Sequence, residues 1–149
     1  MIRKFFGWYS PRFKAISFPL ARANEFEADS ASAQMTSPRA AAQALTGINV
    51  LASYLDRKFW PDIHAAAREH PEPGFSPYSG FVGNEILRIP EDARQGWLKE
   101  ALSQRTSCAD THPSLTDRLQ AIGCEGGLAP PTDSAGAGCL LGSALARLE

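Results

Sequence analysis

The clearest apolar pattern in the chain follows the dipeptide Ser37-Pro38. Apolar side chains recur there at intervals of three or four residues, which places them on one face of a helix. These residues are Ala41, Leu45, Ile48, Ala52, Leu55 and Phe59. Ser37 is suited to capping the helix, Pro38 fits its first turn, and Pro61 is expected to end it. The pattern predicts a helix with this face packed in a core.

Other stretches complete a mainly α fold. Residues 20–35 read as a helix, residues 62–70 as a short one, and residues 91–104 as a helix after Pro90 with three inward side chains, namely Trp97, Ala101 and Leu102. Pro113 suits an early helical position, and Gly123 is expected to end a helix whose apolar face is Leu115, Leu119 and Ile122. Residues 70–80 read as a loop, residues 124–139 as a Gly-, Pro- and Ala-rich connection, and residues 140–148 as a last short helix.

Composition limits the classes of protein. A chain of 149 residues with 44% hydrophobic and 21% charged residues suits one globular domain with a real core. The net charge of −1 gives no bulk attraction to nucleic acid, so no nucleic-acid partner is expected. Cys108, Cys124 and Cys139 form no C-x-x-C pair, which argues against a disulfide framework and a cysteine zinc site. A reducing compartment is the default.

Charge is distributed unevenly along the chain. Residues 1–22 contain five basic and no acidic residues, whereas the remainder contains 10 basic and 16 acidic ones. The basic segment also carries Phe5, Phe6, Trp8, Tyr9, Phe13 and Phe18. Basic residues interleaved with aromatic ones are typical of a membrane-interface segment, and a basic surface strip packed on the domain is the alternative. The localisation is therefore membrane-associated or cytoplasmic.

Candidate chemistry centres on residues 22–29. Glu25 and Asp29 are four residues apart and share one helical face, with Arg22 one turn before Glu25. A carboxylate is an ordinary zinc ligand, and a second carboxylate one turn away can orient a metal-bound histidine. His64 and His70 are six residues apart, so they lie on different helical faces and are expected to be solvated. A pairing of Arg22 with Glu25 or Asp29 is the alternative without a metal.

The stretch Arg22-Ala23-Asn24-Glu25-Phe26-Glu27-Ala28-Asp29 resembles the R-x-x-E-[FY]-x-A-D segment of the HtpX-like and CAAX-prenyl-protease-type zinc metallopeptidases. Residues 111–118 match the T-H-P-x-x-x-x-R segment of the same family. The resemblance implies that Glu25 is the third zinc ligand, and that Asp29 and Arg22 support it. It further implies that His112 stabilises the oxyanion and that Arg118 completes the second motif. Alternatively, His112 only caps the helix, and Asp117 and Arg118 form a surface ion pair or a structural bridge.

The family's defining H-E-x-x-H motif, which supplies two zinc-binding histidines and the general base, does not occur in the sequence. The chain therefore looks like the helical C-terminal portion of a gluzincin-type metallopeptidase domain, or a relative that lost its catalytic helix. We expect a basic aromatic segment at residues 1–22, a partial peptidase-like domain at 23–123 and a tail at 124–149.

Three functions follow from this organisation. The first is a zinc metalloendopeptidase that acts on a peptide or protein substrate and is completed by a missing HExxH-bearing segment. The second is a non-catalytic scaffold or interaction module derived from the same family. The third is a membrane-surface adaptor that uses residues 1–22. By itself, the chain is expected to be inactive and to hold no zinc tightly, because Glu25 lacks histidine partners.

Overall fold

The computed structural model describes residues 2–69 and 89–124, and this part of the chain is mainly helical, as the sequence predicts. The bounds of its elements are α1 Ile2–Met35, α2 Pro38–Tyr54, the π-helical turn η1 Leu55–Phe59, α3 Trp60–Glu69, α6 Glu91–Ser103 and α7 Leu115–Ala121. The predicted loop at 70–80 and final helix at 140–148 lie outside the described residues, as do His70, Cys139 and nearly all of the predicted connection at 124–139.

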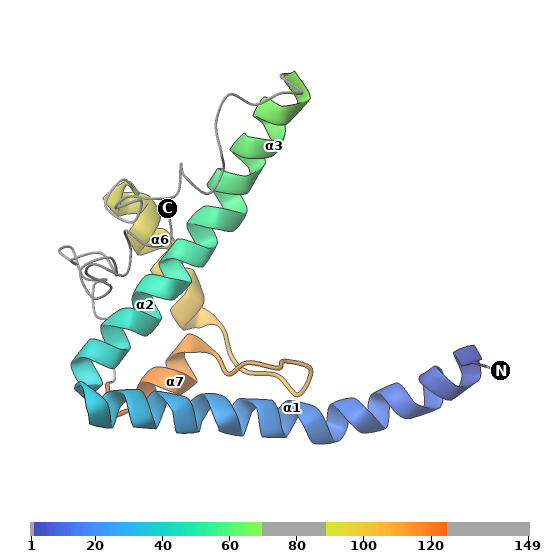
Figure 1. The fold of residues 1–149 in the computed structure, drawn as a ribbon. Coiled ribbons are helices and arrows are strands. Elements are labelled where there is room, and N and C mark those ends of the chain that lie inside the picture. The colour runs from blue at the N-terminus through green and yellow to red at the C-terminus, as the bar shows by residue number, and fades with distance from the viewer. Residues whose placement is uncertain (1, 70–88, 125–149) are drawn as a thin grey trace, which may run out of the picture.

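Two long helical rods meet in a V near Ser37, with α7 inside the V and α6 crossing behind α2 (Figure 1). One rod is α1, and the other is α2 continued by η1 and α3. Helix α7 contacts both α1 and α2, whereas α6 contacts α2 and α7. The N-terminal half of α1 projects beyond the other helices in this view.

The second rod begins as predicted and ends later. The Ser37 side chain accepts a hydrogen bond from the amide of Ala40, which caps the first turn. The expectation that Pro61 ends this helix is wrong, because the chain stays helical through η1 into α3. A proline ring clashes with the carbonyl four residues before it in a regular α-helix. The wider π-helical turn η1 ends two residues before Pro61 and contains the residue four positions before it, which relieves this crowding, so the rod continues to Glu69.

Helix α1 is longer than the sequence suggests. Its predicted start near residue 20 is wrong, since it begins at Ile2 and includes both Pro11 and Pro19. Each internal proline removes one backbone hydrogen bond and disturbs the preceding turn. Figure 1 shows this half of the helix curving toward its N-terminus, so the prolines bend the rod without ending it.

The core lies where α1, α2, α6 and α7 meet. Its buried residues are Ala41, Ala42, Leu45, Leu115, Leu119 and Ile122. Part of the predicted α2 stripe is wrong, because Ile48 is 63% exposed and Ala52 is exposed. The buried face instead includes Ala42, Thr46 and Val50 beside Leu45. Small side chains on this face let the neighbouring helices approach closely, so the buried face includes residues that a count of large apolar positions misses.

Helices α6 and α7 follow the prediction closely. Of the three side chains predicted to face inward from α6, Ala101 and Leu102 pack against the core cluster; the third residue to do so is Leu98, whereas the half-buried Trp97 does not belong to this contact. The predicted α7 face, Leu115, Leu119 and Ile122, is buried.

The ends of α7 are defined by two local features. Ser114 caps its N-terminus by accepting from the amide of Asp117, so Pro113 precedes the helix instead of lying in its first turn. Gly123 has a φ of 73° and ends it as predicted, with the amides of Gly123 and Cys124 bonding back to Gln120 and Leu119.

Among the residues described, no helix is long and apolar enough to cross a membrane.

Candidate functional site

Two carboxylates from the second half of α1 form the base of the candidate site. Glu25 and Asp29 lie one turn apart and both reach the same arginine of α7, which confirms that they share a helical face. The Asp29 side chain is only 7% exposed, whereas that of Glu25 is 30% exposed. Asp29 is therefore enclosed between helices, and Glu25 keeps contact with solvent.

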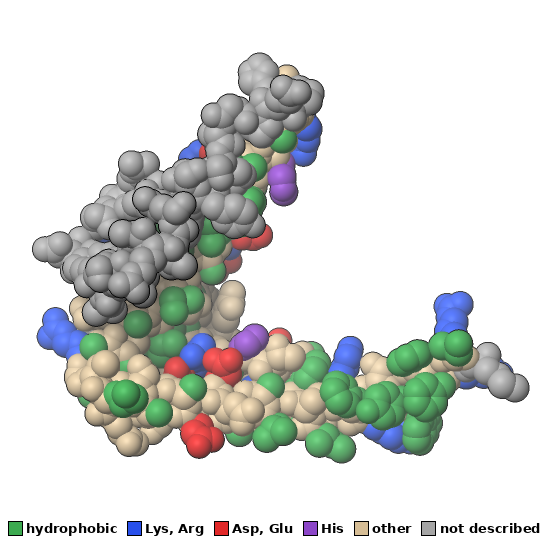
Figure 2. Space-filling model, viewed as in Figure 1, with side chains coloured by type: hydrophobic (Ala, Val, Ile, Leu, Met, Phe, Trp, Pro, Cys, Tyr) green, Lys and Arg blue, Asp and Glu red, His purple; other side chains and the backbone are tan. Residues whose placement is uncertain are grey.

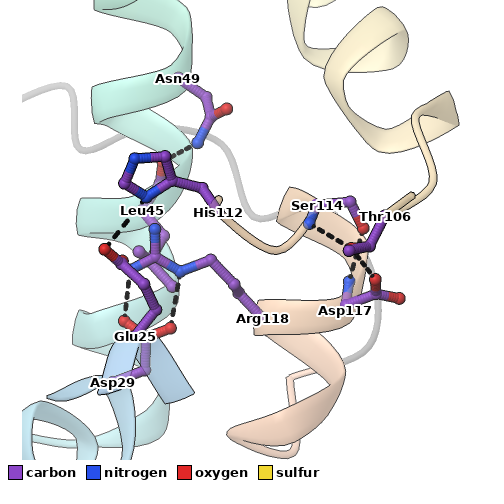
Figure 3. Close-up of polar contacts among 9 residues, drawn as sticks. All are labelled: Glu25, Asp29, Leu45, Asn49, Thr106, His112, Ser114, Asp117 and Arg118. Carbon is purple, nitrogen blue, oxygen red and sulfur yellow. Dashed lines mark hydrogen bonds and ion pairs between the residues drawn. The ribbon is translucent and has the colours of Figure 1, made fainter. Parts of the chain in front are cut away.

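Arg118 of α7 joins the two carboxylates. Its Nε and one terminal nitrogen donate to the two oxygens of Asp29, each at 2.7 Å, in a bidentate pair (Figure 3). The same guanidinium lies 3.1 Å from Glu25 Oε2. The hydrogen bond with Asp29 raises the pKa of Arg118 above its usual value. Arg118 thus forms a structural bridge between α7 and α1, which is one of the alternatives that the sequence left open. Its carboxylate partner is Asp29 and not Asp117.

His112 lies next to Glu25 from the connection between α6 and α7. Its Nδ1 is 3.1 Å from Glu25 Oε1, and its side chain is 71% exposed. The alternative that His112 caps the helix is wrong, because Ser114 occupies that position. In Figure 3 the His112 ring and Asp29 lie on opposite sides of the Arg118 guanidinium, and the Glu25 carboxylate lies beside it. The cluster therefore combines an enclosed ion pair with an exposed imidazole.

Hydrogen bonds hold the segment that carries His112. The Thr106 hydroxyl donates to Asp117 and accepts from the amide of Ser114 at 2.7 Å. The Thr116 hydroxyl donates to the carbonyl of Leu102 at 2.7 Å, which ties the start of α7 to the end of α6. The hydrogen bond from Thr106 is the main reason that the pKa of Asp117 lies below its usual value. These contacts fix the position of His112 from both sides.

Arg22 contributes in a different way from the one expected. Its guanidinium donates to the carbonyl of Asp110 at 2.6 Å, so the predicted pairing with Glu25 or Asp29 is replaced by a contact with the connection before α7. The Asp110 side chain accepts from the amide of Ser107 at 2.7 Å, and this bond lowers the pKa of Asp110. Arg22 thus fastens the His112 segment to α1 one turn before Glu25.

The structure brings together Glu25, Asp29, His112 and Arg118, and it places His64 elsewhere. His64 is exposed on α3, where its ring stacks on Trp60 at a centroid distance of 6.4 Å. Sequence reasoning did not single out Thr106, although it supports the site through Asp117. A signal for this region was present, since Ser114-x-x-Asp117 has the spacing of a helix capping box.

A surface cavity of about 360 Å³ borders the site on the α6–α7 connection. It is lined by residues 104–106 and 109–114, and His112 is among them. Glu25 is not part of its lining. The imidazole therefore stands between the cavity and the Glu25 carboxylate.

The residues described do not by themselves fit a zinc ion. Within residues 2–69 and 89–124, no group of three His, Cys, Asp or Glu side chains is placed to hold a metal. Glu25 is a suitable oxygen ligand, but its neighbours are the cation Arg118 and the single imidazole of His112. A zinc site that used Glu25 needs further ligands from elsewhere.

The comparisons identify a family and no individual relative. The model of peptidase family M48 matches residues 1–125, which is most of the chain. No curated protein and no solved structure matches significantly.

Proposed function

The chain belongs to peptidase family M48, and on this premise we propose that it contributes the glutamate-bearing part of a zinc metallopeptidase site. Members of the family are zinc-dependent metallopeptidases, whose substrates are peptides or proteins. In this proposal Glu25 is the third zinc ligand of a gluzincin site of the HtpX-like or CAAX-prenyl-protease type. An HExxH-bearing segment outside these 149 residues supplies the other ligands and the general base.

One observation carries the proposal. Glu25 and His112 are 87 residues apart in sequence, yet the imidazole and carboxylate are in contact at 3.1 Å. Both residues fall in the two segments that resemble the peptidase motifs. Convergence of independent motif segments on one point is expected of a functional site, because a catalytic constellation is assembled from separate elements.

Each side chain has a distinct task in this proposal. The Asp29–Arg118 pair fixes α1 against α7, so the Glu25 carboxylate keeps one orientation. A ligand held in one orientation loses less conformational freedom when it binds a metal. The exposed His112 imidazole beside a cavity is available to donate a hydrogen bond to a substrate carbonyl oxygen. Arg22 holds the segment that carries His112.

A specific feature favours the scaffold alternative. Glu25 contacts His112 through one oxygen and Arg118 through the other, so the cluster is satisfied without a metal. In the scaffold alternative, the role of this network is purely structural: it joins α1 to α7. The membrane-adaptor alternative depends on other residues, those at the start of α1, and is independent of this cluster.

Zinc titration separates the first two functions. We expect the chain alone to bind no zinc stoichiometrically by isothermal titration calorimetry. The same chain fused to an HExxH-bearing helical segment from an M48 peptidase should bind one zinc per molecule. In the fusion, Glu25→Ala should abolish this binding, whereas Glu27→Ala should leave it unchanged, because Glu27 is exposed on another face of α1.

The outcome that contradicts the proposal is equally clear. If the fusion binds zinc as tightly with Glu25→Ala as without it, Glu25 is not a ligand and the scaffold function replaces the peptidase function. Circular dichroism of each variant distinguishes loss of a ligand from loss of the fold. The coding sequence upstream of Met1 is the direct place to look for the HExxH motif.

A further inference from the structure

The N-terminal half of α1 carries an apolar surface that the proposed site does not use. Its large apolar side chains recur every three or four residues and therefore share one face of the helix. We call this set the apolar stripe. It consists of Ile2, Phe5, Phe6, Tyr9, Phe13, Ile16 and Leu20. Every member is exposed, from 43% at Tyr9 to 75% at Ile2 and Ile16.

Aromatic rings form a ladder along the stripe. Phe5 stacks on Tyr9 at a centroid distance of 5.6 Å, and Tyr9 stacks on Phe13 at 5.8 Å. Within the described residues, no member of the stripe belongs to the core cluster or packs against it. Figure 2 shows hydrophobic side chains gathered on the projecting part of α1, away from the body of the molecule. Monomeric proteins rarely leave an apolar patch of this kind without a partner.

Only basic charges accompany the stripe. Arg3, Lys4, Arg12 and Lys14 lie on the same half of the helix, and the first acidic residue of the chain is Glu25. With 3.6 residues per turn, Arg3 and Lys14 lie beside one edge of the stripe and Arg12 beside the other. The Arg12 guanidinium lies over the Trp8 ring at 4.5 Å and donates to the Trp8 carbonyl at 2.8 Å. The surface is thus apolar along its centre and cationic around it.

We propose that this half of α1 binds in the plane of an anionic phospholipid bilayer. An amphipathic helix with aromatic residues on one face and Lys or Arg around it is suited to the boundary between headgroups and acyl chains. Trp and Tyr favour that boundary because they combine an apolar ring with a polar group. The stripe enters the bilayer surface, and the three cations beside it, Arg3, Arg12 and Lys14, remain at the level of the lipid phosphates and carboxylates.

Charge decides between a bilayer and a second copy of the chain. Two copies that packed stripe against stripe would bring their basic residues together, and no carboxylate of this half of α1 could offset them. Like charges brought together in this way oppose association. An anionic lipid surface supplies the opposite charge along the whole stripe. The lipid surface is therefore the occupant that fits both parts of this helix.

The bilayer contact does not depend on the proposed peptidase function, but it has a consequence for the site. Phe13 and Glu25 lie on one continuous helix, about 18 Å apart along its axis at 1.5 Å per residue. The second half of α1 is fixed to α7 through Arg118. The position of the first half on a membrane therefore also determines where the site lies. Attachment through the stripe holds the Glu25 cluster close to the membrane surface.

Co-sedimentation of the full chain with vesicles tests the proposal. We expect binding to vesicles of phosphatidylcholine mixed with phosphatidylserine, weaker binding in high salt, and little binding to phosphatidylcholine alone. The triple variant Phe5→Ala, Tyr9→Ala and Phe13→Ala should lose at least about tenfold in affinity, because it removes the aromatic ladder. These positions are exposed, so circular dichroism and the thermal transition should be unchanged.

A charge variant and a control complete the experiment. Replacing the three cations beside the stripe, Arg3, Arg12 and Lys14, by Gln should reduce affinity by about a hundredfold, at roughly fivefold for each charge. The control carries Trp60→Ala, Arg68→Gln and Lys99→Gln, which remove exposed aromatic and basic side chains elsewhere, and it should bind like the wild type.

Three results overturn the proposal. The first is a wild-type chain that does not sediment with anionic vesicles, and the second is a ladder variant that sediments like the wild type. The third is a wild-type dimer in analytical ultracentrifugation that becomes a monomer in the ladder variant while vesicle binding is absent. That last result would assign the stripe to a second copy of the chain.

Discussion

The two halves of helix α1 differ in which kind of side chain is exposed to solvent and which is buried. In residues 2–20 the large apolar side chains other than the half-buried Phe18 are exposed, whereas in residues 22–35 a carboxylate is enclosed. Across all 34 residues of this helix, the single buried residue is Asp29. One continuous helix therefore presents its apolar side chains to the outside and places a charge in its tightest packed position.

The difference follows from what each half contacts. The second half lies against α2 and α7, where Arg118 offers Asp29 two charge-assisted hydrogen bonds. The first half projects beyond the other helices in Figure 1, and the aromatic contacts recorded for it are between its own rings. A hydrophobic pattern thus defines the faces of a helix, while the partner of each face decides which of them becomes buried.

The largest expected effect tests whether buried apolar residues contribute more to the free energy of unfolding than the exposed residues of the stripe. Leu119 is 2% exposed in the core, so Leu119→Ala should lower the free energy of unfolding by about 2–5 kcal/mol. Ile16 is 75% exposed on the stripe, so Ile16→Ala should change it by less than about 0.5 kcal/mol. Urea denaturation followed by circular dichroism measures both values.

The contrast between these two substitutions matters more than either value. Each removes apolar atoms from a helical residue and leaves a helix-favouring alanine. A loss at Ile16 comparable to that at Leu119 would mean that the first half of α1 packs against the body in solution. In that case the stripe would not be available for a bilayer.

The second prediction concerns the enclosed charge. Asp29→Asn preserves the size of the side chain but leaves Arg118 without its bidentate partner, which should cost about 2–3 kcal/mol of stability. Glu27→Gln removes an exposed carboxylate two residues earlier and should be close to neutral. Thermal or urea unfolding compares the two variants directly.

A double-mutant cycle isolates the pair. If Asp29 and Arg118 act together, the double variant Asp29→Asn with Arg118→Met should lose less than the sum of the single changes. Strict additivity would show that the bidentate contact contributes nothing to joining α1 and α7. The enclosed half of α1 would then owe its position to apolar packing alone.

Much of the fold could be predicted because its helices carry strong local signals. Ser37-Pro38 marked the start of α2, and Leu115, Leu119 and Ile122 gave the buried face of α7. The register of α2 was partly missed, because small and polar residues such as Ala42 and Thr46 take buried places while Ile48 is exposed. That choice depends on which helices approach α2, which is not encoded in the sequence of α2 itself.

The candidate site was less predictable than the fold, because most of its contacts join residues that are far apart in the sequence. The face shared by Glu25 and Asp29 follows from a spacing of four residues, but its pairing with Arg118 joins positions 89 residues apart. No local pattern contains that contact, and the motif resemblance only placed its members in the same family segments. The contact of Arg22 with a backbone carbonyl could not be anticipated, because any carbonyl is a potential acceptor.

The smallest expected effect concerns the hydrogen bonds that join the start of α7, at Ser114 and Asp117, to Thr106 in the connection that follows α6. Bonds from Thr106 and then Ser114 lower the pKa of Asp117, so the folded state binds its proton less readily than the unfolded state. The stabilisation is therefore fully present above the unfolded pKa of about 3.9 and is lost as the pH falls through the lower folded value. The acidic limb of the stability profile should reflect this loss.

Asp117→Asn tests the effect without changing the shape of the side chain. The difference in unfolding free energy between wild type and this variant should be largest near neutral pH and should shrink as the pH falls below about 4. Thr106→Val removes the leading hydrogen bond and should weaken the same pH dependence while leaving the carboxylate in place. Urea unfolding at several pH values measures both. A pH-independent difference would mean that the ionised carboxylate of Asp117 does not stabilise the start of α7, and that the bond between Thr106 and Ser114 holds this segment without it.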